Sequence, residues 1–196
     1  MKIGLYGGTF DPPHLGHVHV VEAARKLLGD QTIVVMPDST PPHKAKPRSA
    51  TALQRLEMAR LAFGHISGVE VSDLEIRRGG ISYTADTVRQ LRQLYPGCEP
   101  VLIMGTDMFL CLESWREPKV LFACELAVVP RNENEREQIE AQKRLYVEKY
   151  GAKVQVSAEP AVPLSSTRLR NEGLEACLLP EAVLAYIRRE GLYGGA

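Results

Sequence analysis

The first twenty residues constrain the fold of this chain more than any other stretch. A short apolar run over residues 3–6 meets two glycines and a polar turn with two prolines, and a helical pattern follows from Gly16. A strand, a glycine turn and a helix start in this order predict a phosphate site, since glycine lets the backbone approach an anion and a helix start offers unpaired N–H groups. His14 and His17 are three residues apart, so both can face that anion.

The remaining chain alternates strand and helix patterns. Extended segments are expected over residues 2–6, 32–36, 69–76, 100–104, 125–129 and 153–156. Helices are expected over about 16–28, 50–63, 84–95 and 134–150, with short ones between residues 107 and 122 and two more within 164–191. This alternation predicts an α/β fold with a mainly parallel sheet flanked by helices and a small helical part at the C-terminal end. Without an internal repeat or linker, residues 1–196 are expected to form a single domain.

Composition excludes several classes of partner. The 24 basic and 24 acidic residues cancel, which argues against a nucleic-acid or anionic-membrane partner. No apolar run approaches about eighteen residues, so no membrane span is expected, and the N-terminus lacks a secretory pattern. Four widely spaced cysteines predict reduced thiols and a cytoplasmic location. The oligomeric state cannot be predicted from the sequence, although an oligomer is compatible with it.

Polar clusters follow five of the expected strands. They occupy residues 7–17, 41–44, 105–107, 131 and 165–170. Ligands of parallel sheets bind outside the carboxyl ends of the strands, so these clusters are predicted to share one site.

The histidine pair has three interpretations. His14 and His17 can cap a helix, ligate a metal together with His19, or act on phosphate. Zinc needs further ligands at a recognisable spacing, and the chain has neither His-Glu-x-x-His nor a cysteine pair, so no metal site is expected. The preceding glycines favour phosphate chemistry, in which the histidines donate to a developing pentavalent phosphate.

The segment Ser165-Ser166-Thr167-Arg168-Leu169-Arg170 has two interpretations. Serine and threonine are common helix N-caps. Hydroxyls and N–H groups at a helix start, followed one turn later by arginine, also form a phosphate cradle. Together with the histidine turn, this segment favours the triphosphate of a nucleotide as ligand.

Four further features are candidates for the site, and three of them have two interpretations. Lys44, in the proline-rich loop 37–49, is either solvated or folds over a polyphosphate. Tyr83 and Thr84 begin a helix. Asp107 starts a helix or holds ribose hydroxyls, and Trp115, the sole tryptophan, belongs to the core or stacks on a flat heterocycle.

The motifs together resemble the nucleotidylyltransferase superfamily, and in particular the bacterial nicotinate-nucleotide adenylyltransferase family. The resemblance rests on Gly-Gly-Thr-Phe-Asp-Pro-Pro-His-Leu-Gly-His (7–17), Pro-Pro-His-Lys (41–44), Ser-Tyr-Thr-Ala-Asp-Thr (82–87), Gly-Thr-Asp (105–107), Ser-Trp-Arg (114–116) and the Ser-Ser-Thr-x-Leu-Arg turn (165–170). It implies a Rossmann-like, doubly wound fold. It also implies a reaction of nicotinate mononucleotide with ATP and Mg²⁺ that gives deamido-NAD and pyrophosphate.

The resemblance also implies roles for individual residues. The catalytic residues would be His14, His17 and Arg170, all at the ATP phosphates. The rest of the ATP site would be Gly7, Gly8, Thr9, Phe10, Lys44, Ser165, Ser166 and Thr167. The mononucleotide would be bound by Tyr83, Thr84, Gly105, Asp107 and Trp115.

Two departures from the family pattern are visible. Leu164 and Leu169 replace the usual isoleucines, which is a conservative change of packing. Arg131 follows Val-Pro instead of preceding Pro-Gly, and its role is left open. A sibling adenylyltransferase acting on phosphopantetheine or a flavin nucleotide, and a nucleotide-binding sensor without turnover, are the alternative hypotheses. The sequence does not settle the choice between the acid and the amide mononucleotide.

Overall fold

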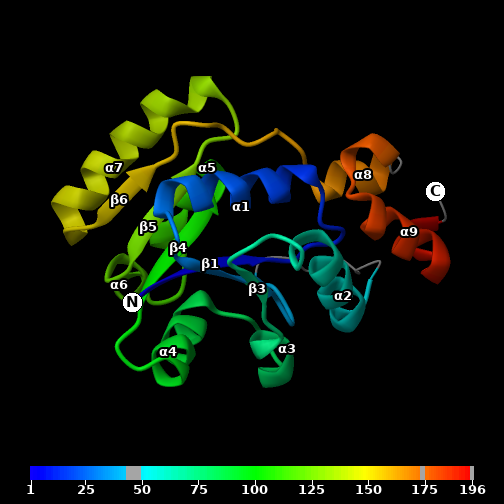
Figure 1. Cartoon of the computed structure of the whole chain (residues 1–196). Coiled ribbons are helices and arrows are strands. Elements are labelled where there is room, and N and C mark those ends of the chain that lie inside the picture. The colour runs from blue at the N-terminus through cyan, green and yellow to red at the C-terminus, as the bar shows by residue number, and fades with distance from the viewer. Residues whose placement is uncertain (43–49, 173–174, 195–196) are drawn as a thin grey trace.

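A six-stranded sheet forms the centre of the molecule (Figure 1). The structure, a computed structural model, describes residues 1–42, 50–172 and 175–194. The strands are β1 (Lys2–Gly8), β2 (Thr32–Pro37), β3 (Val69–Val71), β4 (Glu99–Gly105), β5 (Glu125–Val129) and β6 (Lys153–Val156). Their order is β3-β2-β1-β4-β5-β6 and each neighbouring pair is parallel, which confirms the predicted α/β fold.

Both faces of the sheet are covered by helices. The helices are α1 (Leu15–Leu28), α2 (Ala52–Phe63), α3 (Leu74–Arg78), α4 (Thr84–Leu94), α5 (Thr106–Leu110), α6 (Pro118–Phe122), α7 (Arg136–Tyr150), α8 (Ser166–Glu172) and α9 (Glu181–Glu190). Short 3₁₀ turns are η1 (Leu112–Ser114), η2 (Glu133–Glu135), η3 (Ala176–Leu178) and η4 (Leu192–Gly194). Side chains of α1, α2 and α9 share one apolar cluster, and those of α4 to α7 share the other.

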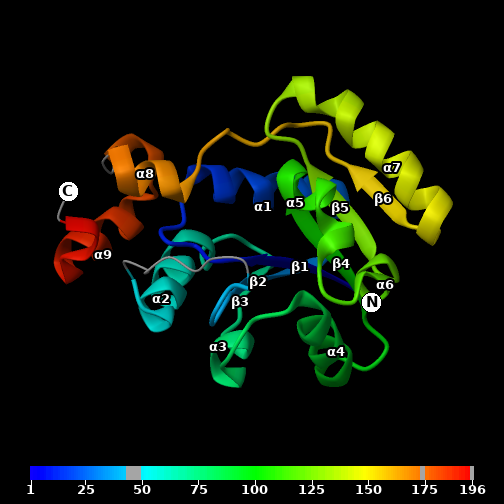
Figure 2. The same ribbon diagram turned by 180° about the vertical axis from the view of Figure 1, so that it is seen from behind.

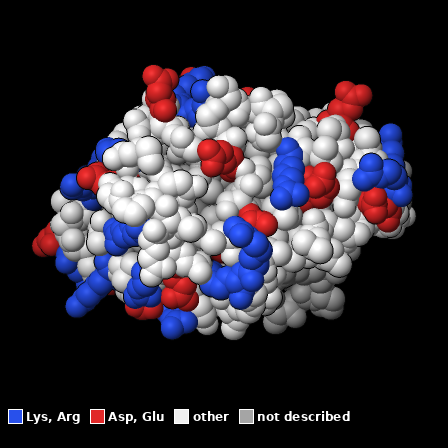
Figure 3. Space-filling view, turned by 60° about the horizontal axis from the view of Figure 1, so that its bottom comes forward, with Lys and Arg blue, Asp and Glu red and all other residues white. Residues whose placement is uncertain are grey.

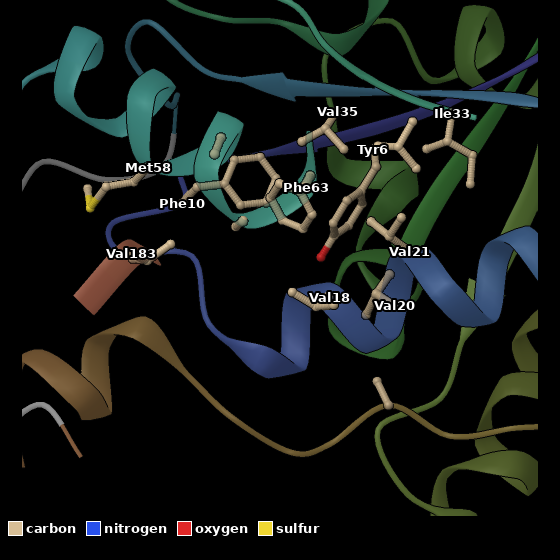
Figure 4. Close-up of a cluster of buried hydrophobic side chains, with 14 of the residues drawn as sticks. Tyr6, Phe10, Val18, Val20, Val21, Ile33, Val35, Met58, Phe63 and Val183 are labelled. Atoms are coloured by element: carbon tan, nitrogen blue, oxygen red, sulfur yellow. The ribbon is translucent and has the colours of Figure 1, made fainter. Parts of the chain in front are cut away.

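Strand β2 shows why the sheet needs two covered faces. Its side chains alternate with the period of two that a strand imposes. Ile33 and Val35 enter one cluster, whereas Val34 and Met36 enter the other. Figure 4 shows the first cluster, in which Phe10 from the turn after β1 lies beside Phe63 of α2.

The C-terminal helices α8 and α9 lie together at one end of the molecule, next to α2 (Figures 1 and 2). They confirm the predicted C-terminal helical part. The loop that carries the two prolines after β1 runs between this part and the sheet. The chain therefore brings its two predicted phosphate-binding turns to the same end of the fold.

One predicted element is wrong in part. Residues 69–76 were expected to be extended, but the strand β3 ends at Val71 and α3 begins at Leu74. Apolar residues alternate with polar ones over most of this stretch, which imitates a strand. Glu75 is nevertheless buried and accepts a hydrogen bond of 2.5 Å from the Thr87 hydroxyl of α4, a tertiary contact that local periodicity does not reveal. The helix expected from residue 134 begins with η2 and continues as α7.

The point where the strand order reverses lies between β1 and β4. From β1 the chain passes to β2 and β3 on one side, and β4, β5 and β6 extend the sheet on the other. The loops after β1 and β4 therefore lead to opposite sides and leave a crevice at the carboxyl ends of the two strands.

One face of the molecule shows mixed charge. On the face in Figure 3, basic and acidic side chains are interspersed among uncharged ones. Among the described helices, none is long and apolar enough to cross a membrane.

Candidate active site

A cleft of about 360 Å³ opens at the carboxyl ends of β1 and β4. It is lined by members of both predicted groups. From the phosphate group these are Gly7, Gly8, Thr9, Phe10, His14 and His17, and from the mononucleotide group Tyr83, Thr84, Gly105, Asp107 and Trp115. The structure thus brings predicted site residues that are as far apart in the sequence as Gly7 and Trp115, 108 positions, to one cavity.

His14 and His17 stack on each other at the start of α1. Their ring centroids are 3.7 Å apart and their planes differ by 23°. The backbone N–H of His14, the N-cap residue, donates to Nδ1 of His17 over 3.2 Å. This bond places the proton of a neutral His17 ring on Nε2, the nitrogen that can then donate to a ligand. Phe10 packs edge-on against His17 with centroids 5.2 Å apart and so fixes the ring orientation from the core side.

His14 is held as a neutral side chain. It is only 3% exposed, and burial, assisted by the charge of Arg131, lowers its pKa from 6.5 to about 4. Its Nδ1 has no hydrogen-bond partner among the residues that the structure describes. A phosphate anion brought next to this ring would favour the imidazolium form and raise the pKa again.

Gly16 is required by close packing around the histidines. A Cβ atom there would lie 2.8 Å from the carbonyl oxygen of Val162 and 3.0 Å from Nδ1 of His14. Gly7 differs, because a Cβ atom built on it meets no atom of the described chain within 4 Å. Gly7 therefore leaves open space at the cleft, and Gly16 lets the segment before α8 cross the start of α1.

The Ser-Ser-Thr turn is docked directly on the turn after β1. Oγ of Ser166 donates to the carbonyl oxygen of Pro12 over 2.9 Å, and Nη1 of Arg170 donates to the carbonyl oxygen of Asp11. Nη2 of Arg170 also donates to Oγ1 of Thr167 over 3.3 Å. The side chains of this turn do not line the cleft wall themselves; their segment reaches it through Ala161, Val162 and Leu164. Ser165 acts as a cap, since its Oγ accepts from the Arg168 N–H over 3.2 Å.

A buried ion pair supports the first turn from below. Arg55 of α2 is fully buried and its Nη1 lies 3.0 Å from Oδ1 of Asp38, which follows β2. The same nitrogen donates to the carbonyl oxygen of Thr9 over 2.7 Å, and Oγ1 of Thr9 donates to Oδ2 of Asp38 over 2.7 Å. This network fixes the glycine turn to two neighbouring elements. The sequence analysis did not identify this network. The signal was the position of Arg55, four residues before Ala59 on the apolar stripe of α2, where an arginine is buried and needs a partner.

An aromatic wall forms the other end of the cleft. Trp115 is half-buried there, and its Nε1–H donates to Sγ of Cys111 over 3.4 Å. The guanidinium of Arg116 lies 4.5 Å from the centre of the Tyr83 ring. The carboxylates of Asp86 and Glu117 approach Arg116 only to 3.9 and 3.7 Å. Arg116 makes no hydrogen bond to any residue in the described ranges, so its donors remain available at this end.

Glu75 of α3 lines the cleft and contacts α4 through Thr87. Burial raises the pKa of this cleft-lining carboxyl, against the opposing effect of the Thr87 hydroxyl that donates to it. Arg78 of α3 in turn donates to Oγ1 of Thr87 over 3.2 Å and to Oε1 of Gln90 over 2.6 Å. These contacts fix the start of α4, which carries Tyr83 and Thr84.

Asp107 and Arg131 form an ion pair just beyond the carboxyl ends of the neighbouring strands β4 and β5. Nη2 of Arg131 lies 2.7 Å from Oδ2 of Asp107, and both side chains line the cleft. Glu135 accepts from the backbone N–H of Arg131 over 2.8 Å and from Oγ1 of Thr106. Arg131, whose role the sequence left open, is therefore the ion-pair partner of Asp107, which is predicted to bind the mononucleotide.

Two further predictions concern Lys44 and metals. Lys44 lies outside the described residues. Within the described ranges, no group of three or more His, Cys, Asp or Glu side chains is placed to hold a metal ion.

Comparison with known proteins places the chain in a family. The cytidylyltransferase-like family model matches residues 5–172. A "Probable nicotinate-nucleotide adenylyltransferase" of Desulfitobacterium hafniense (strain Y51) is 37% identical over 198 residues, which covers 98% of this chain and 95% of that protein. This chain belongs to the nicotinate-nucleotide adenylyltransferase family. A member from Neisseria meningitidis (serogroup A, strain Z2491), with the same printed name, is 35% identical over 195 residues, 98% of each chain.

Solved structures share the fold of this family member. The Plasmodium falciparum nicotinic acid mononucleotide adenylyltransferase complexed with NaAD aligns with a TM-score of 0.78 at 20% identity, over 100% of this chain and 98% of that chain. The same Plasmodium enzyme complexed with APC aligns with a TM-score of 0.76 at 18% identity, over the same shares of each chain. At this level of identity the likeness shows the fold.

Proposed function

We propose that this adenylyltransferase-family chain transfers the adenylyl group of ATP to nicotinate mononucleotide, with deamido-NAD and pyrophosphate as products. The observation that carries the proposal is the contact between the two phosphate turns. Ser166 and Arg170 bind the backbone of the turn that leads to His14 and His17, so one triphosphate can reach both. The cleft continues from there to the aromatic wall, which suits a second, flat ligand.

At the phosphate end, the reaction is a direct displacement. A phosphate oxygen of the mononucleotide attacks the α-phosphorus of ATP, the bond to the bridging oxygen of the β-phosphate breaks, and pyrophosphate leaves on the far side. We assign Nε2 of His17 to donate to the developing charge, as its tautomer requires. The lowered pKa of neutral His14 rises as the phosphate approaches, so the ring can take up a proton. Arg170 balances the charge of the leaving group.

At the aromatic end, we assign the pyridine ring to Trp115 and its carboxylate to the start of α4 and Arg116. Tyr83 and Thr84 precede and begin an eleven-residue helix, whose first N–H groups favour a negative charge. Arg116 adds a cation that has no hydrogen-bonded carboxylate in the described chain. Both features favour the acid over the amide. Asp107 holds the mononucleotide in this assignment, after exchange of its ion pair with Arg131.

Mg²⁺ enters this proposal with ATP. The described part of the cleft gathers no three-ligand group, and Mg²⁺ bound to a nucleotide keeps phosphate and water oxygens as its main ligands. The residues that hold the phosphates therefore hold the ion indirectly, and the ion would neutralise charge on the phosphate oxygens.

We also propose that residues 1–196 work as one domain. A cytoplasmic location is proposed too, which the free thiols Cys98, Cys111, Cys124 and Cys177 support.

The test is product formation with labelled ATP. ATP carrying label in the α-phosphate is incubated with Mg²⁺ and one of four acceptors: nicotinate mononucleotide, nicotinamide mononucleotide, phosphopantetheine or FMN. The proposal expects label in deamido-NAD, with one pyrophosphate released for each dinucleotide formed. Label transfer only to phosphopantetheine or FMN, or no transfer to any acceptor, would overturn it.

A further inference from the structure

The C-terminal turn η4 places a tyrosine against the phosphate turns. Tyr193 has φ 60° and ψ 27°, a left-handed conformation that few aromatic residues adopt. Its hydroxyl donates to Oδ1 of Asp11 over 2.6 Å, across 182 residues of sequence. Burial, and then the Asp11 carboxylate, raise the pKa of Tyr193 well above its usual range, so the phenol keeps the proton that it donates.

Asp11 is shared between this tyrosine and the arginine of the Ser-Ser-Thr turn. Its carboxylate is almost fully buried, and Oδ2 lies 3.9 Å from Nη1 of Arg170. That nitrogen donates to the backbone oxygen of Asp11 instead of to its carboxylate. The carboxylate therefore turns one oxygen to Tyr193 and forms no hydrogen bond with the guanidinium.

We propose that Tyr193 is a positioning residue for ATP binding, because it restrains the Asp11 carboxylate and so keeps Arg170 available to the triphosphate. Among the residues that the structure describes, Arg170 is the cation within ion-pair distance of the buried carboxylate, and it could turn to it if the hydroxyl were absent. A hydrogen-bonded Asp11–Arg170 pair would compete with phosphate for the same donors. The inference rests on the proposed binding of ATP phosphates by Arg170, and it adds a residue that lies outside both phosphate-binding turns of this chain.

The test measures ATP affinity separately from mononucleotide affinity. Tyr193→Phe keeps the ring and removes only the hydroxyl. Its dissociation constant for ATP is expected to rise about tenfold, the scale of one charge-assisted hydrogen bond, whereas that for nicotinate mononucleotide stays within about twofold. Tyr186→Phe is the matched control, since the Tyr186 hydroxyl of α9 forms no hydrogen bond within the described chain; its constants should equal those of the wild type.

A second variant separates the charge effect from a loss of packing. In Tyr193→Phe combined with Asp11→Asn, the neutral amide cannot neutralise Arg170, so ATP affinity should return towards the wild-type value. An unchanged ATP affinity in Tyr193→Phe would overturn the inference. Equal losses for both ligands would do so too, as would a double variant no better than the single one. ATP binding is measured by calorimetry without the second substrate, so this test does not depend on turnover. Wild-type protein that makes no dinucleotide would instead refute the proposed function.

Discussion

The pH dependence of stability tests the buried state of His14. The perturbation is His14→Gln, which keeps a polar side chain of similar length but removes the titrating ring. In the folded protein the pKa of His14 is lowered from 6.5 to about 4. At about 1.36 kcal/mol per pKa unit, this difference corresponds to roughly 3 kcal/mol of folding free energy.

The sign follows from proton binding. Between pH 6.5 and about 4, the unfolded chain protonates His14 and the folded chain does not, so the unfolded state binds more protons there. The free energy of unfolding therefore falls as the pH falls through this window. Above about pH 7.5 the ring is almost entirely neutral in both states and contributes little pH dependence.

Urea unfolding of both proteins provides the measurement. From about pH 7.5 to about pH 4.5, wild type should lose roughly 2–3 kcal/mol more unfolding free energy than His14→Gln. Groups that do not contact His14 titrate equally in both proteins and cancel in this comparison. A difference that stays constant over the whole range would mean that folded His14 titrates near its ordinary pKa, and the argument from burial would be refuted.

Three further variants test the site. His17→Ala should lower kcat by ~10²-fold, the usual scale for one transition-state donor, whereas His19→Ala on the same helix should stay within about twofold; a normal kcat in His17→Ala would remove it from the chemistry. Arg116→Gln should reduce the preference for nicotinate over nicotinamide mononucleotide, measured as a ratio of kcat/KM, by about tenfold, and an unchanged ratio would exclude Arg116 from acid recognition. Arg55→Met should cost ~3–5 kcal/mol of unfolding free energy because it removes one partner of a buried ion pair. Adding Asp38→Leu should recover much of that loss, and a stable single variant would contradict the role of the pair.

Local pattern was sufficient to predict the opening strand, turn and helix, and to place His14 and His17 together at the start of that helix. The apolar run, the glycines and the helix pattern lie within twenty residues, and the structure has a strand, a turn and α1 in that order. The main difference is that α1 starts at Leu15, with His14 itself as the N-cap, instead of near Gly16. Because strand ends of a parallel sheet meet at one edge, the pattern also predicted that the polar clusters share a cleft.

Tertiary partners explain what the sequence did not reveal. Arg55 and Asp38 are a buried pair only because α2 packs beside the end of β2, and no spacing rule joins positions 38 and 55. Glu75 lies in a helix fixed by Thr87, where alternation suggested a strand. Tyr193 meets Asp11 from the opposite end of the chain. Each depends on contacts between distant segments, which periodicity and capping rules cannot detect.

The most direct test of the whole account is a crystal structure with ATP whose α,β-bridging oxygen is replaced by carbon. The account predicts triphosphate oxygens within about 3 Å of Nε2 of His17 and, in the same molecule, of the Arg170 guanidinium. A nucleotide that contacts only one of these two turns, or binds away from the cleft between β1 and β4, would contradict it.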